Sequence, residues 1–190
     1  MKKIILLAAM LLPMCLQAQK PLTPFYTREE APHLENVIPA PPELTSPLFS
    51  NDWNQYLWGK SIRETERGMQ AVTDAKIGGS FFFKRYSEAM GIKTMTKEDY
   101  PVLYDLLKRA HLTEMEAGAS AKQHFARVRP YQQFKEESGV PKSENPTDFT
   151  SYPSGHTHAA WLTGMILTAV APVVFRALCF DGIALTQVYA

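Results

Sequence analysis

The placement of proline constrains the fold of this chain more than any other feature of its sequence. Seven of the fourteen prolines fall between Pro21 and Pro47, and the next one is Pro101. Because proline has a fixed φ and no backbone N–H, residues 20–50 cannot form a long helix and are expected to run extended over the surface. Residues 51–172 carry apolar side chains at helical spacing, and no stretch alternates as a strand does. The sequence therefore predicts an all-α fold with a proline-rich N-terminal segment and one helical domain.

Local signals divide the helical domain into elements. Gly91 is suited to stop a helix, Pro101 suits the first turn of the next one, and Thr113-Glu-Met-Glu116 matches a capping box. The predicted helices are 51–76, 77–90, one from Pro101 that buries Leu103, Leu106, Leu107 and Ala110, then 114–129 and 153–171, with a polar loop at 131–152.

Residues 1–19 have the layout of a secretory signal peptide. Two lysines precede an unbroken apolar run, Ile4 to Leu12, and Ala18 supplies a small residue where a signal peptidase can cut. The run is far shorter than the roughly 20 residues of a spanning helix, so it predicts export rather than a membrane anchor. We therefore expect a periplasmic or secreted protein.

Charge and cysteine content narrow the class of protein further. Twenty basic and nineteen acidic residues give a formal net charge of +1, which argues against a dedicated nucleic-acid binder. Two cysteines are too few for a disulfide framework. With 190 residues, the chain is long enough for one compact domain and too short for two ordinary ones.

Lys122 and Arg129 form the first candidate site. They are seven residues apart, so a helix that runs to Arg129 would place both on one face, two turns apart. Pro130 disfavours helical geometry at the preceding residue, which would put the guanidinium where the helix ends. An ammonium and a guanidinium on one face can hold separate oxygens of a tetrahedral oxyanion. The alternative is a solvated basic face that also includes Arg127 and Lys135.

The tetrapeptide Pro153-Ser154-Gly155-His156 forms the second candidate site. With Pro153 at the first helical position, the next three amides would have no intrahelical acceptor and would favour an anion at the positive end of the helix dipole. Gly155 would let a phosphate approach the backbone, and Ser154 adds a hydroxyl. His156, with an ordinary pKa of about 6.5, suits a proton donor to a leaving alkoxide, and a bound anion would raise that pKa. The alternative is an ordinary helix start with a surface histidine.

Together, Lys-x6-Arg-Pro and the later Pro-Ser-Gly-His resemble the signature of the bacterial class A non-specific acid phosphatases. These belong to the type 2 phosphatidic acid phosphatase and vanadium haloperoxidase superfamily. The likeness extends to Val37-Ile-Pro-Ala-Pro-Pro42, Arg63-Glu-Thr-Glu-Arg67-Gly68 and Ser151-Tyr152, and it covers roughly residues 36–172. It implies the helical bundle of that superfamily and hydrolysis of phosphate monoesters through a phosphohistidine, with no cofactor and no metal.

The resemblance also implies a role for each site residue. Lys122 and Arg129 would bind phosphate oxygens, Ser154 and Gly155 would bind phosphate through hydroxyl and amide, and His156 would be the general acid. The implied partners are small-molecule phosphate monoesters, without nucleic acid and without a membrane span once the signal is removed. Assembly into a homo-oligomer stays open.

The third segment of the family pattern, Ser-Arg-x5-His-x3-Asp, is absent from this chain. In the family it supplies a phosphate-binding arginine, the nucleophilic histidine and the aspartate that orients it. The chain has no Ser-Arg pair, only His158 follows His156, and residues 173–190 form an atypical tail. We therefore expect a C-terminally truncated bundle that is inactive. The alternatives are a non-catalytic phosphate-binding remnant, a lipid phosphatase of the same superfamily, and a metal site made of His156, His158 and Asp148.

Overall fold

The computed structural model describes residues 21–75, 85–87, 90–139 and 149–171, and these residues contain helices and no strand, as the sequence predicts. The elements are η1 (Leu34–Asn36), α1 (Phe49–Ser61), α2 (Glu66–Asp74), α4 (Pro101–Phe125), α5 (Pro130–Gln133) and α6 (Gly155–Val170). The predicted signal peptide 1–19, the tail 173–190 and most of the predicted helix 77–90 lie outside the described residues. Gly91 has a φ of 67°, which suits the stop expected there.

Helix α4 is a single long helix, whereas the sequence analysis placed a new helix start near Glu114. Pro101 occupies the first turn as predicted, but the helix continues through the supposed capping box to Phe125. The hydroxyl of Thr113 donates to the Arg109 carbonyl one turn earlier and accepts from the Phe25 amide. Thr113 is therefore satisfied inside a helix, and the predicted helix start at this point is wrong.

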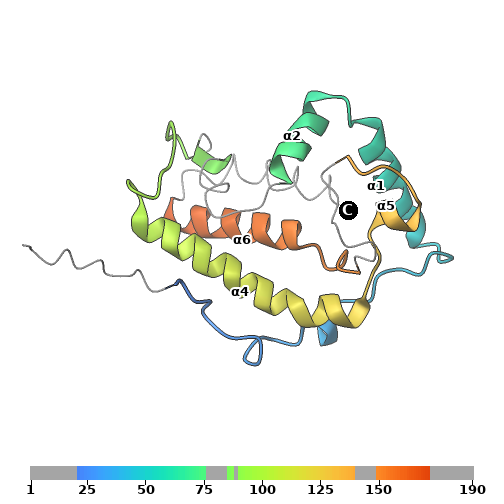
Figure 1. The fold of residues 1–190 in the computed structure, drawn as a ribbon, viewed down its shortest axis with the longest axis horizontal. Helices are drawn as coiled ribbons and strands as arrows, with labels where there is room; N and C mark the ends of the chain where they lie inside the picture. Colours follow the sequence, from blue (N-terminus) through green and yellow to red (C-terminus); the bar gives the residue numbers. More distant parts are fainter. Residues whose placement is uncertain (1–20, 76–84, 88–89, 140–148, 172–190) are drawn as a thin grey trace, which may run out of the picture.

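Helices α4 and α6 pack side by side in opposite directions and form the centre of the fold (Figure 1). Lys122 near the end of α4 contacts Pro153 just before α6, whereas Leu107 near the start of α4 shares a buried cluster with Leu167 near the end of α6. Gly118 of α4 lies against α6, because a Cβ placed there would come 3.7 Å from the His158 ring. A small residue at such a contact lets two helices approach closely. The small buried residues of the two helices are Ala110, Ala117, Gly118 and Ala121 on α4 and Ala159 and Ala160 on α6.

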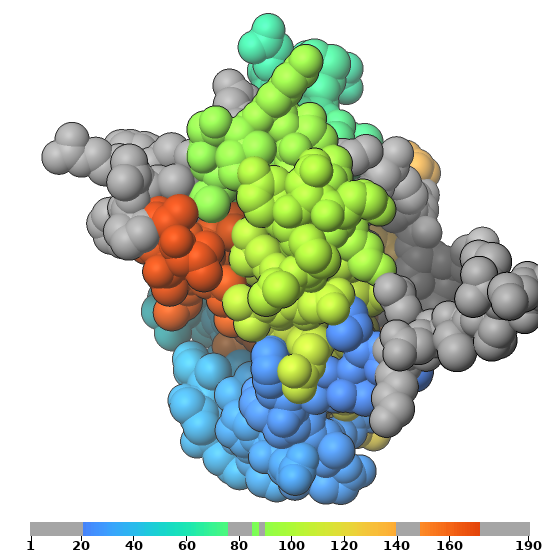
Figure 2. Space-filling model, turned by 90° about the vertical axis from the view of Figure 1, so that its left-hand side faces the viewer, coloured from blue at the N-terminus to red at the C-terminus, as the bar shows by residue number. Residues whose placement is uncertain are grey.

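Residues 21–48, here called the N-terminal strap, run along α4 as the proline content predicts. Figure 2 shows the strap against the lower part of the face that α4 occupies. Its only described helical turn is the three-residue η1. Four hydrogen bonds join the strap to α4 in sequence order. The Arg109 side chain donates to the Thr23 carbonyl, and the Phe25 amide donates to the Thr113 hydroxyl. Further along, Arg28 donates to Glu116, and the Ser120 hydroxyl donates to Glu35.

The predicted helix 51–76 is two helices, because the chain turns at residues 62–65. Thr65 caps the start of α2 by accepting a hydrogen bond from the Gly68 amide. The carbonyl oxygens of Ile62 and Arg63 lie so close to the Gly68 Cα that a Cβ there would fall 2.4 and 2.2 Å from them. The turn directs α2 so that Ala75, just after it, reaches His156.

Candidate active site

The start of α6 lies two residues later than predicted. Ser154 is the N-cap, in an extended conformation, and its hydroxyl accepts a hydrogen bond of 3.3 Å from the Thr157 amide. The first helical residues are therefore Gly155 and His156, and Pro153 stands outside the helix. Because Ser154 satisfies the Thr157 amide, the amides at the positive end of α6 with no acceptor in the helix include those of Gly155 and His156.

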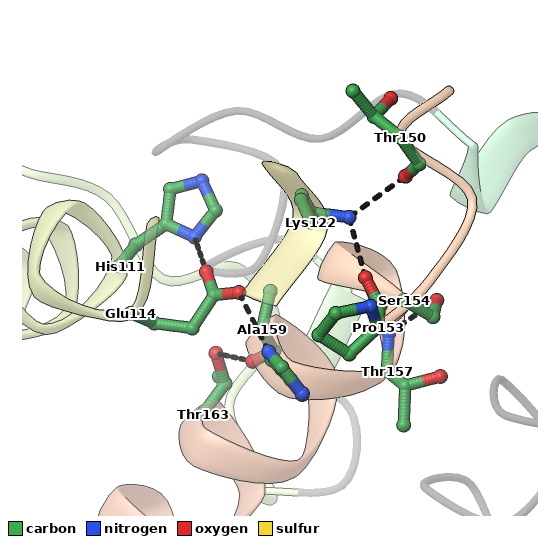
Figure 3. Close-up of polar contacts among 10 residues, drawn as sticks. His111, Glu114, Lys122, Thr150, Pro153, Ser154, Thr157, Ala159 and Thr163 are labelled. Carbon is green, nitrogen blue, oxygen red and sulfur yellow. Dashed lines mark hydrogen bonds and ion pairs between the residues drawn. The ribbon is translucent and has the colours of Figure 1, made fainter. Parts of the chain in front are cut away.

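Lys122 lies in the last turn of α4 and reaches the start of α6, as Figure 3 shows. Its ammonium donates to the Thr150 carbonyl at 2.9 Å and to the Pro153 carbonyl. A Cβ placed on Gly155 would lie 4.0 Å from the Lys122 Cε. The antiparallel packing of α4 on α6 thus brings the first motif to the second.

Arg129 is not on the helix that carries Lys122, so the prediction that both share one helical face is wrong. Helix α4 ends at Phe125, Ala126 has a φ of 43°, and Arg129 is the extended N-cap of α5. The predicted effect of Pro130 on Arg129 is nevertheless confirmed by its ψ of 140°. The Arg129 Nη2 donates to the Thr150 hydroxyl at 3.0 Å.

Thr150 therefore receives hydrogen bonds from both cations, one on its carbonyl oxygen and one on its hydroxyl. Arg127, the other arginine of the segment, turns to α1 and pairs with Asp52 at 2.7 Å. The two charges that the first motif selects converge, and a third charge of the same segment does not. This selectivity argues against a uniformly solvated basic face.

His156 projects toward α2 from the first turn of α6. Its Nε2 lies 3.1 Å from the Ala75 carbonyl oxygen, which accepts the ring proton. Burial lowers the pKa of His156 below its ordinary value, the Ala75 hydrogen bond opposes this, and the charges of Arg129 and Lys122 lower the pKa further. The site without an anion thus favours neutral His156, and a bound dianion would act in the opposite direction.

Glu114 is a buried carboxylate beside this site that sequence reasoning assigned to a capping box. Its Oε2 lies 3.3 Å from His111 Nδ1 (Figure 3). Its Oε1 lies 3.4 Å from the Nδ1 of a second imidazole, His158. Burial raises the pKa of Glu114, but the close contacts and charges of His111 and His158 together outweigh it, and the net shift is downward. His158 thus faces α4 while His156 faces Ala75, as their two-residue spacing predicts.

The described residues contain no group of three His, Cys, Asp or Glu side chains arranged to hold a metal ion. Asp148, the third member of the metal site considered from the sequence, lies outside them. Among the described helices, none is long and apolar enough to cross a membrane.

Gly155→Ala is expected to leave the fold intact and to weaken anion binding at least tenfold. The free protein has room for the methyl group, whose nearest neighbours are Glu114 Oε1 and Lys122 Cε at 4.0 Å, and alanine is the better helix former. An anion held by Lys122 and the α6 amides would meet that methyl group. Titration calorimetry with vanadate, beside a melting curve, measures both effects.

Gly164→Ala is the matched control, because Gly164 is on the same helix and a Cβ there meets nothing within 4 Å. Equal vanadate affinity in Gly155→Ala and the wild type would remove Gly155 from the site.

Comparison with known proteins finds acid phosphatases among the relatives of this chain. The chain is 35% identical over 141 residues to a non-specific acid phosphatase of Providencia stuartii, which covers 72% of this chain and 55% of the relative. It is 32% identical over 155 residues to the non-specific acid phosphatase of Salmonella typhi, with 80% and 61% covered. An acid phosphatase of Zymomonas mobilis is 30% identical over 139 residues, with 70% and 50% covered.

No family model matches the chain. The chain spans between 50% and 61% of the length of the three relatives described above. On this similarity, the chain belongs to the family of bacterial non-specific acid phosphatases.

Proposed function

We propose that this protein is an exported acid phosphatase that acts on small phosphate monoesters. The observation that carries the proposal is the meeting of Lys122 and Arg129 at Thr150, beside the start of the helix that begins Gly155-His156. A phosphoryl dianion placed there receives charged hydrogen bonds from both side chains, and the α6 amides add donors aligned with the helix dipole. The family supports the reaction class.

His156 is the general acid in this proposal. Its Nε2 proton, held by the Ala75 carbonyl in the free protein, passes to the leaving alkoxide oxygen as the bond from phosphorus to that oxygen breaks. The protonated imidazole becomes neutral in this step. The surroundings of His156 favour the neutral form, which makes it a stronger acid than an exposed histidine.

We assign no described residue as the nucleophile. In the family a histidine of the Ser-Arg-x5-His-x3-Asp segment attacks phosphorus, and the 190 residues contain no match to that segment. A second candidate function is a protein that binds phosphate monoesters without hydrolysing them, because binding needs only Lys122, Arg129 and the start of α6.

The pH dependence of p-nitrophenyl phosphate turnover tests the first proposal. Because the pKa of His156 is lowered, kcat/KM should be greatest at acidic pH. As the pH rises, kcat/KM should start to decline before about pH 6.5 is reached and then decrease about tenfold for each further pH unit. His156→Ala should reduce turnover by a factor of about 100 or more.

Vanadate binding by the same preparation separates the two candidate functions. Folded protein that binds vanadate but gives no turnover at any pH supports the non-catalytic candidate. Folded protein that neither binds vanadate nor turns over substrate refutes both. Activity that rises steadily above pH 8 contradicts the role given to His156.

A further inference from the structure

Thr150 occupies a place in the site that none of the family motifs assigns. Its carbonyl oxygen accepts from the Lys122 ammonium at 2.9 Å, and its hydroxyl oxygen accepts from Arg129 Nη2 at 3.0 Å. The two cations come from α4 and from the start of α5, whereas Thr150 comes from the segment before α6. One exposed residue thus joins two charges that the chain supplies from separate elements.

Two cations that converge on one anion repel each other while the anion is absent. In the free protein, the acceptors of their hydrogen bonds therefore set the positions of the two cations. A donor that is already in position loses less conformational freedom when a phosphate binds. The Thr150 hydroxyl accepts from Arg129 Nη2, so it can hold the guanidinium in place before an anion binds.

The segment around Thr150 is anchored independently of its hydroxyl. The Ser151 amide donates to the Arg127 carbonyl at 3.1 Å, and the Tyr152 hydroxyl donates to the Pro39 carbonyl of the strap at 2.8 Å. The Tyr152 ring also packs against Phe125, with ring centroids 5.3 Å apart. Removing the Thr150 hydroxyl therefore changes the support of Arg129 and leaves the course of the backbone in place.

We propose that Thr150 is a positioning residue of the phosphate site, and that its hydroxyl holds the Arg129 guanidinium at the place where a tetrahedral oxyanion binds beside Lys122. The inference rests on the proposed function, because it needs an anion at this site. Thr150 acts through Arg129, so the loss of its hydroxyl should lower anion affinity only while Arg129 is present.

Thr150→Val replaces the hydroxyl with a methyl group at nearly constant volume, and Thr150→Ser keeps the hydroxyl. Calorimetric titration of the full chain with vanadate, and separately with inorganic phosphate, should give about tenfold weaker binding for the valine variant. The serine variant should stay within about threefold of the wild type, because a serine hydroxyl offers the same lone pairs. Thr94→Val, at an exposed threonine near the opposite end of α4, is the matched control and should bind as the wild type does.

A double-mutant cycle with Arg129→Ala decides whether Thr150 works through Arg129. In the Arg129→Ala background, Thr150→Val should cause no further loss, which a general weakening of the fold would not produce. Wild-type affinity in Thr150→Val, or an equal loss with and without Arg129, overturns the assignment while the phosphate site stands. A wild-type chain that binds neither anion overturns the proposed function and this inference together.

Discussion

Replacing Lys122 and Arg129 together with alanine is expected to lower the affinity for vanadate and for phosphate at least 100-fold. Each side chain supplies a charged hydrogen bond, worth about 1.5–3 kcal/mol, and both meet at one residue, Thr150. Each single variant should show a smaller loss of about tenfold or more. Inhibition constants against substrate turnover, or calorimetric dissociation constants where turnover is absent, measure the effect.

Arg127→Ala is the matched control for this experiment. Arg127 is two residues from Arg129 and carries the same charge, but its guanidinium pairs with Asp52 on α1. If the site depends on geometry rather than on net positive charge, Arg127→Ala should change anion affinity less than about threefold at physiological salt. A loss in Arg127→Ala equal to that in Arg129→Ala would mean that vanadate binds a diffuse basic surface.

Several features marked by proline could be predicted from the sequence, because proline acts locally, although Pro153 stands outside α6 and not in its first turn as predicted. Pro101 at the start of α4, the extended geometry of Arg129 before Pro130, and the course of the strap all follow from a fixed φ and a missing N–H. The predicted helix start near Glu114 was wrong because the side chain that suggested it has a distant partner. Thr113 has the letters of a cap but bonds Phe25 of the strap, 88 residues away, and α4 runs on through it.

The sequence predicted which residues lie close together better than it predicted how they are brought there. The motifs select Lys122, Arg129 and the start of α6, and the structure brings both cations to Thr150, just before α6. A shared helical face was expected, whereas the packing of α4 against α6 and the short α5 bring them together. The contacts of Thr150 and Glu114 were not predicted, because they exist only after that packing and no local spacing indicates them.

Gly68→Ala is expected to destabilise the protein by about 3 kcal/mol, which corresponds to a fall in Tm of about 6 to 12 °C. The added Cβ would lie 2.2 Å from the Arg63 carbonyl oxygen and 2.4 Å from that of Ile62. Both neighbours are backbone atoms of the turn between α1 and α2, so relief requires the turn to move. Thermal or urea unfolding of the purified variant measures the loss.

Gly59→Ala supplies the matched control, since Gly59 lies inside α1 and a Cβ there meets nothing within 4 Å. The higher helix propensity of alanine should leave that variant as stable as the wild type or slightly more so.

A second measurement, the His156 titration, links the turn between α1 and α2 to the site. In the free protein, the hydrogen bond to the Ala75 carbonyl raises the His156 pKa. Because α2 positions that carbonyl, a displaced turn should weaken the hydrogen bond and so lower the pKa. Gly68→Ala should therefore shift the His156 titration seen by NMR to lower pH, whereas Gly59→Ala should not. A Gly68→Ala protein with wild-type stability and an unchanged titration would mean that the turn does not set the position of α2 against His156.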